Sequence, residues 1–189
     1  MTELEQYIGN YFEAEKQELT DIASYFKPQQ VRKGDYLLKT GRVCNQLSFI
    51  SEGLVRIYVQ MEDKEVTQWI SNKGYFLTDL ASFIFQTPAR WNMQALSDCD
   101  MYTIDRNDYI NLGNVIKNWH RIEKAFMAKC FVMLEDRVFS HLAMSAEERY
   151  QRFYSFQPEL FNQVPLQYLA SMLGMTPETL SRIRKKAIG

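Results

Sequence analysis

The chain has 189 residues, of which 46% are hydrophobic, and a formal net charge of −1. This is enough for one large or two modest domains with buried cores, whereas no segment approaches the ~20 consecutive apolar residues of a membrane-spanning helix. The three cysteines, Cys44, Cys99 and Cys130, are odd in number and widely spaced, which argues against a disulfide framework or a four-cysteine cluster and favours small buried side chains.

Residues 1–28 carry apolar side chains at helical spacing and are predicted to be helical up to Pro28. The members of this stripe are Leu4, Tyr7, Ile8, Phe12, Leu19, Ile22 and Phe26. Glutamates dominate the same segment, which lacks the basic and then apolar pattern of a signal peptide. We therefore expect a cytosolic protein.

From residue 31 to about residue 104 the hydrophobic period changes from 3.6 toward 2, and turn residues recur at short intervals. One run places Val55, Ile57 and Val59 on one side and Arg56, Tyr58 and Gln60 on the other. Short strands with frequent turns predict an antiparallel sandwich or barrel, with its polar residues facing outward. Within it, residues 80–85 lack alternation and predict a brief helix.

Helical spacing returns from Asp108 onward, and a long helix is predicted with two adjacent stripes. The first stripe contains Trp119, Ile122, Phe126, Cys130, Met133, Arg137 and Ser140, and the second contains Met127, Phe131, Leu134, Val138 and Leu142. One stripe can pack on its own domain and the other on a twin helix, which favours a homodimer. The alternative is that both stripes lie in the core of a single chain.

A further helix is predicted over 146–156, and Pro158 and Pro165 precede the most informative segment, residues 164–186. That segment begins with apolar residues at i, i+3, i+4 and i+7: Leu166, Leu169, Ala170 and Leu173. Gly174 permits a turn, Thr176 is a suitable N-cap, and Pro177 suits the first position of a second helix. The pattern is that of a helix-turn-helix, whose second helix enters the major groove of DNA.

In the second helix Leu180, Ile183 and Ala187 share one face, and Glu178, Ser181, Arg182 and Lys185 point the opposite way. Arg182 has the geometry to bond guanine O6 and N7, and a carboxylate such as Glu178 accepts from cytosine N4. The alternative is a surface ion pair between these two side chains, worth only ~0.3–0.5 kcal/mol.

Charge is distributed unevenly along the chain. Residues 1–115 contain 11 basic and 16 acidic side chains, a net of −5, whereas residues 116–189 contain 11 basic and 7 acidic ones, a net of +4. Because neutralisation of phosphates dominates nucleic-acid affinity, the positive half is the part expected to bind a duplex.

The order of strands, long helix and helix-turn-helix resembles the Crp/Fnr superfamily of bacterial transcription regulators over essentially the whole chain. The resemblance rests on VRKGDYLLKTG at 31–41, FISEGLVRIY at 49–58 and LGMTPETLSRIRKK at 173–186. It implies an α+β fold with a double-stranded β-helix (jelly-roll) sensor domain of the cyclic nucleotide-binding type, a dimerisation helix and a DNA-binding helix-turn-helix domain.

In this family the recognition helix usually carries a Ser/Thr cap followed by Arg-Glu-Thr-hydrophobic-x-Arg. The matching positions are Thr176, Glu178, Thr179, Leu180 and Arg182. Pro177 replaces the first arginine, so the operator need not be the family's usual half-site. The run at 181–184 resembles the short members of Bacteroidetes-type bacteria. The chain ends soon after Lys186, where many members add a β-hairpin wing, and the sequence leaves open whether a wing follows.

The resemblance also implies where a cyclic nucleotide would bind. Nucleotide-binding members have Gly-Glu for the ribose and, about ten residues later, Arg-Ser/Thr-Ala for the phosphate, whereas this chain has Thr78-Asp79 and Arg90-Trp91-Asn92. Asp79 is one methylene too short and Trp91 is bulky. We therefore expect a pocket that does not bind cyclic AMP in the usual way, with Asp79, Arg90, Trp91 and Asn92 as candidate contacts for a nucleotide-like or other effector.

No metal or other cofactor is expected, since His120 and His141 lie 21 residues apart on one predicted helix, ~30 Å along its axis. No catalytic motif is found, so an enzyme is not expected. The predicted domains are a sensor at 1–115, a dimerisation helix at 116–144 and a helix-turn-helix domain at 145–189.

The predicted function is that of a homodimeric, sequence-specific DNA-binding transcription regulator. The partners are double-stranded DNA, a second copy through the 116–144 helix, and possible small-molecule effectors of unknown chemistry. The candidate DNA contacts are Thr176, Glu178, Thr179, Ser181, Arg182, Lys185 and Lys186, with Arg184 partly structural. The alternative is a small-ligand module whose terminal helices serve only as a dimer or partner surface.

Overall fold

The computed structural model describes residues 1–188, and side chains as far as residue 186. The chain folds as two compact units, one formed by Met1–Ile57 with Ser71–Phe131 and the other by Tyr58–Ile70 with the residues from Val132 onward. Within residues 1–188, no helix combines the length and hydrophobicity that a membrane crossing requires. The two units are described in turn.

The first unit combines short helices with a β-roll. Its helices are α1 (Glu3–Tyr11), α2 (Lys16–Ser24), α3 (Leu80–Phe85), α4 (Arg106–Val115) and the first half of α5 (Trp119–Ala143). Its strands are β1 (Lys27–Val31), β2 (Tyr36–Leu38), β3 (Gln46–Glu52), the first half of β4 (Val55–Gln60), β6 (Phe76–Leu77), β7 (Asn92–Ala95) and β8 (Cys99–Asp105). The predicted strands between 31 and 104 and the brief helix at 80–85 are therefore confirmed.

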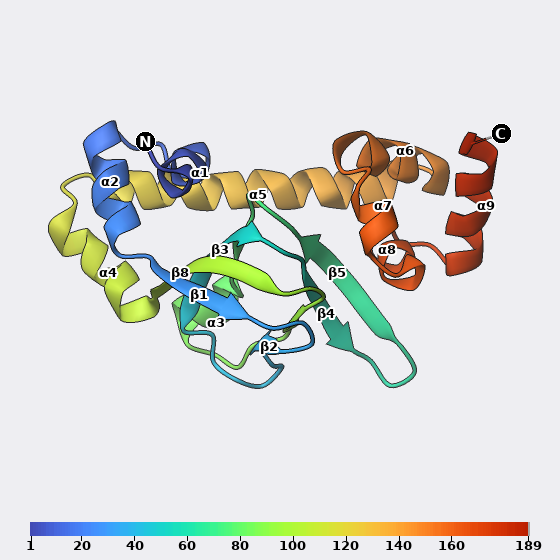
Figure 1. The fold of residues 1–189 in the computed structure, drawn as a ribbon, viewed down its shortest axis with the longest axis horizontal. Helices are drawn as coiled ribbons and strands as arrows, with labels where there is room; N and C mark the ends of the chain where they lie inside the picture. Colours follow the sequence, from blue (N-terminus) through green and yellow to red (C-terminus); the bar gives the residue numbers. More distant parts are fainter. Residues whose placement is uncertain (189) are drawn as a thin grey trace. The chain divides into compact units, whose positions relative to one another are not determined.

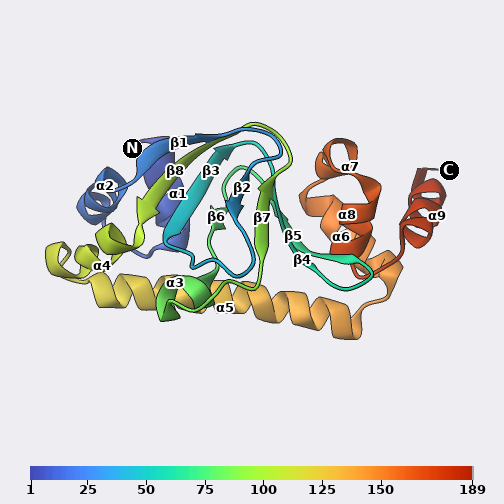
Figure 2. The same cartoon turned by 90° about the horizontal axis from the view of Figure 1, so that it is seen from below.

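The strands form two four-stranded sheets with the orders β1-β8-β3-β6 and β2-β7-β4-β5, where β5 is Glu65–Ser71. In the first sheet β8 lies between β1 and β3 and is antiparallel to both, as Figures 1 and 2 show. Ser48 faces Thr103 in this register, and their hydroxyl groups are 2.8 Å apart. Two antiparallel sheets with a long helix and C-terminal helices give the α+β, jelly-roll architecture expected from the sequence.

The N-terminal segment differs from the prediction, because residues 1–28 form two helices rather than one. Thr2 begins α1 with a capping box to Glu5, and the chain leaves helical geometry at Phe12 before α2 starts at Lys16. Pro28 does not end a helix but lies in β1. β1 is an edge strand of its sheet, a position that tolerates the missing N–H of proline.

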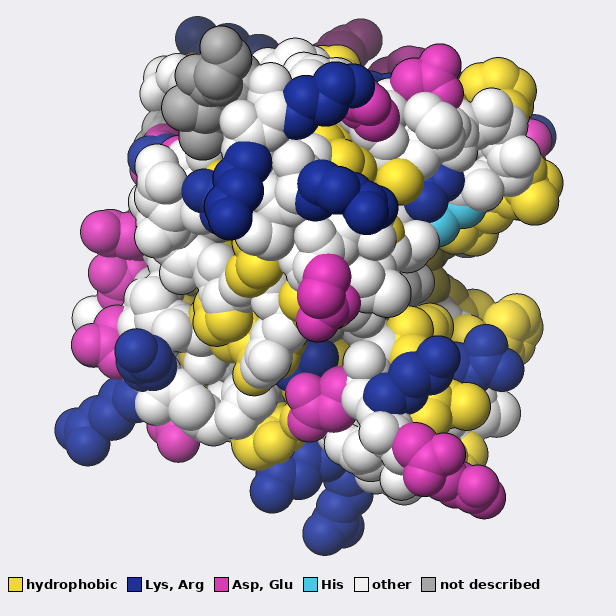
Figure 3. Space-filling model, turned by 90° about the vertical axis from the view of Figure 1, so that its right-hand side faces the viewer, with side chains coloured by type: hydrophobic (Ala, Val, Ile, Leu, Met, Phe, Trp, Pro, Cys, Tyr) yellow, Lys and Arg dark blue, Asp and Glu magenta, His cyan; other side chains and the backbone are white. Residues whose placement is uncertain are grey.

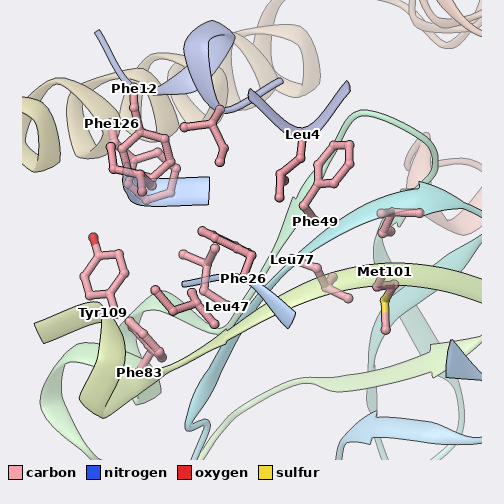
Figure 4. Close-up of a cluster of buried hydrophobic side chains, with 14 of the residues drawn as sticks. Leu4, Phe12, Phe26, Leu47, Phe49, Leu77, Phe83, Met101, Tyr109 and Phe126 are labelled. Atoms are coloured by element: carbon pink, nitrogen blue, oxygen red, sulfur yellow. The ribbon is translucent and has the colours of Figure 1, made fainter. Parts of the chain in front are cut away.

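The core of the first unit is rich in aromatic side chains that join the helices to the first sheet (Figure 4). Phe12 of the N-terminal segment stacks on Phe126 of α5, with ring centroids 4.5 Å apart and planes inclined by 8°. Trp119 and Ile122 of the first predicted stripe are also buried. Burying side chains of this size contributes about 1.5–3 kcal/mol each, so this stripe fixes α5 to the first unit.

The cysteines behave as small apolar side chains. Cys44 and Cys99 are buried, Cys130 is half-buried, and all three are free thiols. Burial raises the pKa of Cys99 and of Cys130. Because the thiolate is the reactive form, these two groups are poor nucleophiles at neutral pH.

One prediction about β4 is wrong. Arg56 and Tyr58 were expected to face outward, but Arg56 is only 2% exposed and Tyr58 only 6%. Val55, on the opposite side of the strand, is also buried, so β4 is covered on both faces over this stretch. A period-2 pattern identifies a strand but cannot show that a second layer covers its polar side.

The second unit contains the C-terminal helices. They are the second half of α5, α6 (Ala146–Phe156), α7 (Leu160–Gln163), α8 (Leu166–Met172) and α9 (Pro177–Ile188), together with β5 and the end of β4. The predicted helix at 146–156 is confirmed, and Ser145 starts it with a capping box to Glu148.

The second predicted stripe of α5 is largely exposed. Its exposed members are Phe131 (60%), Leu134 (50%), Val138 (49%) and Leu142 (82%), whereas Met127 packs partly on the core. Val132 and Phe139 are also at least 42% exposed, and so is Met133, a member of the first predicted stripe. A contiguous apolar surface of this kind on a helix is typical of a protein–protein contact.

Candidate DNA interface and ligand cassette

Helices α8 and α9, called here the helix pair, are joined by a turn that the sequence specifies closely. The N–H of Met175 donates to the carbonyl of Ala170 at 2.9 Å, and Gly174 has φ +66°, the left-handed geometry that commonly ends helices. Thr176 Oγ1 then accepts from the N–H of Thr179 at 3.2 Å and caps α9. Thr176 therefore has a structural role in addition to any contact with DNA.

The inner sides of the helix pair are buried against each other and against α6. The buried members are Leu169, Ala170, Met172, Leu173, Leu180 and Ile183. This packing fixes the rotation of α9, so its opposite side faces outward. The residues predicted to form the outer face lie on this side: Glu178, Arg182 and Lys185 are exposed, and Ser181 is half-exposed.

An open groove of about 520 Å³ runs along the outer face. It is lined by Leu166, Pro177, Glu178, Ser181, Arg182 and Lys185. Figure 3 views the side on which α9 lies in Figure 1, and Lys and Arg side chains, dark blue, project from it. The structure thus gathers four predicted contact residues around one groove.

Glu178 and Arg182, on the outer face of α9, do not form an ion pair with each other among the described residues. This disfavours the surface-pair alternative. Hydrogen bonds to its own backbone N–H and to Thr176 lower the pKa of Glu178. Glu178 is therefore an ionised acceptor and Arg182 a free forked donor, the states that base contacts require.

Two further cationic side chains of α9, Lys186 and Arg184, have different partners within the protein. Lys186 Nζ lies 2.9 Å and 3.1 Å from the carboxylate oxygens of Glu147 on α6, in an exposed ion pair. Such pairs contribute about 0–1 kcal/mol, so a phosphate can replace Glu147 at little cost. Arg184 lies 5.8 Å from the ring centroid of Phe161 and is half-buried, in agreement with its expected structural role.

Arg149 of α6 is a residue that the sequence reasoning missed. Its guanidinium donates to three backbone carbonyls: Leu173 (2.8 Å), Gly174 (3.2 Å) and Met144 (2.6 Å). It thereby joins the end of α8 to the end of α5, using the planar fork that lysine lacks. The hydrogen-bond partners of Arg149 are backbone carbonyls up to 25 positions away. A pattern of side chains in the sequence therefore cannot predict this role.

Replacing Gly174 with alanine is expected to lower the free energy of unfolding by about 1–2 kcal/mol, the cost of a left-handed conformation for a residue with Cβ. The added methyl group would also lie 3.1 Å from Cδ2 of His141. Urea unfolding of the variant measures the loss. In a His141→Ala background the contact is absent, and the loss should be smaller; an equal loss in both backgrounds would assign the whole effect to the backbone.

In the predicted ligand cassette of the first unit, Asp79 is hydrogen-bonded to backbone groups of the protein itself. Asp79, 6% exposed, accepts from the N–H of Ser82 at 3.1 Å through Oδ1 and from the N–H of Arg90 at 3.3 Å through Oδ2. Ser82 Oγ in turn accepts from the N–H of Cys44 and donates to the carbonyl of Thr87. The carboxylate of Asp79 thus caps α3 and also occupies the N–H group of Arg90.

The other predicted cassette residues have separate surroundings among the described residues. The side chain of Arg90 is exposed, Trp91 is half-buried, and Asn92 Oδ1 accepts from the N–H of Thr40 at 3.0 Å. A cavity of about 200 Å³ lies nearby, but none of the four predicted residues lines it. Its lining is Leu37, Leu38, Val43, Cys44, Asn45, Gln46, Ser48, Leu77, Thr78, Met93 and Asp105.

Residues 28–114 match the family model of the cyclic nucleotide-binding domain. No curated protein resembles the chain closely enough to count as a match.

Among solved structures, the chain is similar to the c-di-GMP-responsive global regulator CLP of Xanthomonas campestris (TM-score 0.68, 15% identity, 92% of this chain and 91% of that one). It is also similar to FixK2 of Bradyrhizobium japonicum (TM-score 0.70, 17% identity, 85% and 83%) and to the Thermus thermophilus catabolite activator protein (TM-score 0.55, 20% identity, 91% and 83%). These neighbours are regulators of the Crp/Fnr type, so the resemblance inferred from the sequence is confirmed in the fold.

Proposed function

From a β-roll that matches the cyclic nucleotide-binding domain, followed by a helix pair with an exposed cationic groove, we propose that the protein is a homodimeric, sequence-specific DNA-binding transcription regulator of the Crp/Fnr type. The observation that carries the proposal is the outer face of α9. Its inner side is buried and its outer side presents Arg182, Lys185 and an ionised Glu178 around one groove. Such a regulator acts on DNA in the cytoplasm and is not an enzyme.

The roles of the candidate residues follow from their positions on α9. Arg182 and Glu178, near the start of the helix, read base edges in the major groove. Lys185, Lys186, Ser181 and the hydroxyls at the N-terminal turn, Thr176 and Thr179, contact phosphates and fix the register. Lys186 exchanges the carboxylate of Glu147 for a phosphate when the duplex binds.

Dimerisation is assigned to the exposed stripe of α5. Phe131, Leu134, Val138 and Leu142 recur at steps of three and four residues, the spacing of a two-helix seam. A parallel pair of such helices related by a two-fold axis presents two copies of α9. Two copies match palindromic half-sites about one helical turn, ~34–36 Å, apart.

The sensor domain is proposed not to bind cyclic nucleotides in the family's usual way. Asp79 already accepts from the N–H groups of Ser82 and Arg90, and a second anion at these donors would be repelled. An effector of another kind would have to use different residues, such as those around the 200 Å³ cavity.

Calorimetric titration of the purified protein with cyclic AMP and cyclic GMP is expected to show no binding at micromolar concentrations. The matched variant Asp79→Asn removes the internal carboxylate charge while keeping the side-chain length. Micromolar affinity in the unaltered protein would contradict this proposal about the sensor domain.

Selection of random duplexes by the purified protein tests the proposed function. We expect the recovered sites to share a sequence with two-fold symmetry and to bind more weakly as salt increases. A small-ligand module whose helices serve only as a partner surface would recover no common sequence. That result would overturn the proposal.

A further inference from the structure

The hairpin formed by the end of β4 and by β5, residues 58–70, packs with the C-terminal helices in the second unit. The same strands also continue the sheet β2-β7-β4-β5 of the β-roll. Through β5, this hairpin contacts the second half of α5, α6 and α8.

Trp69 of β5 lies between two of these helices. The guanidinium of Arg137 on α5 lies 5.0 Å from the centroid of its indole ring, within the range of a cation–π contact. The ring of Phe153 on α6 meets Trp69 edge to face, with centroids 6.1 Å apart and an interplanar angle of 81°. Burial lowers the pKa of Arg137 to about 10, which leaves this group charged at neutral pH.

A hydrogen bond ties the same strand to the helix pair. The backbone N–H of Thr67 donates to Oγ of Ser171 on α8 at 2.9 Å. Thr67 is only 2% exposed, so loss of the serine hydroxyl would leave a buried N–H without this acceptor. β5 thus contacts α5, α6 and α8 through Trp69 and Thr67.

These contacts leave the outer face of α9 free. Arg182, Glu178 and Lys185 remain exposed while the hairpin is docked, so the hairpin does not block the groove. α9 packs on α8 and α6, the helices that β5 contacts. An element that fixes α6 and α8 therefore fixes α9 as well.

We propose that Trp69 is a positioning residue for DNA reading: the β4–β5 hairpin holds α6 and α8, and through them α9, in the orientation that enters the groove. The inference rests on the proposed DNA-binding function.

Hydrogen exchange of the full chain without DNA tests the contact itself, and binding to a selected duplex tests its consequence. For Trp69→Ala we expect amides of α6 and α8 to exchange at least tenfold faster, while those of β3 and β8 are unchanged. We also expect about tenfold weaker binding to the duplex with the same preferred sequence, because the outer face of α9 is intact. Trp69→Phe keeps an aromatic ring between the helices and should restore most of both properties.

Two further variants complete the test. Ser171→Ala alters the helix side alone and should speed exchange in α8 with the hairpin sequence intact. Phe156→Ala removes an aromatic side chain from the same α6 that is 75% exposed, and it should leave exchange and binding unchanged.

Unchanged exchange in α6 and α8 of Trp69→Ala would overturn the inference, and so would faster exchange with unaltered duplex affinity. Faster exchange that extends to β3 and β8 would reduce Trp69 to a general stabilising residue and would also overturn it. If the unaltered protein binds no duplex, the proposed function fails by itself. The exchange comparison then still decides whether the hairpin holds the helices.

Discussion

Replacing Arg182 with alanine is expected to weaken binding to the selected duplex by about 1–3 kcal/mol, roughly 5- to 150-fold, and to relax the preference at one base pair. The physical reason is the free state of this side chain. Arg182 is exposed, lines the groove along α9 and forms no ion pair with Glu178, so its forked donors are available to guanine O6 and N7. Among the described residues the Arg182 side chain makes no hydrogen bond or ion pair that the substitution would remove, so folding should be unaffected.

The measurement is a binding isotherm on the selected duplex and on duplexes changed at single positions of the site. Lys186→Ala is the matched control, a cation on the same helix whose ammonium bonds Glu147. It should weaken all duplexes alike and reduce the slope of log affinity against log salt by about 1. Equal losses on every duplex for Arg182→Ala would contradict base reading and leave Arg182 as a phosphate contact.

The C-terminal helices were predictable because the residue types at their ends strongly prefer those positions. Thr176 caps α9, Pro177 begins it and Gly174 adopts positive φ before it, each as the residue type alone suggests. The buried side of the helix pair followed from a 3.6-residue period. The two stripes of α5 were separable for the same reason. Only the structure shows that the first is buried as far as Phe126, whereas most of the second is exposed.

The roles that depend on distant partners could not be predicted. Arg137 was placed in an apolar stripe without explanation, and the structure supplies one, since its guanidinium lies over Trp69 from another part of the chain. Asp79 was identified as a poor ribose ligand. Its bond to the N–H of Ser82 is a local cap of α3, but its contact with the N–H of Arg90, 11 residues later, depends on how the chain returns. Arg149 bonds only backbone carbonyls, which carry no sequence pattern.

Exchanging Leu134 and Val138 for glutamate is expected to convert the protein to monomers and to reduce affinity for the two-fold duplex at least 100-fold. Both side chains are about half exposed at the centre of the α5 stripe, where the proposed seam would bury them in two copies. Full burial of such a side chain is worth about 1.5–3 kcal/mol, and the dimer of the double variant loses the seam's share of this contribution at four side chains. Four carboxylates brought together in a dry seam would add repulsion and desolvation.

Sedimentation velocity at micromolar concentration measures the mass, and duplex binding measures the consequence for DNA. The conservative pair Leu134→Met with Val138→Ile keeps an apolar surface of similar volume and should remain dimeric. Because neither side chain is buried in the single chain, the glutamate variant should keep its fold, and its circular dichroism spectrum checks this. A folded, dimeric glutamate variant would place the two-fold contact elsewhere. A folded monomer with full affinity would show that one copy of α9 is enough to read the site.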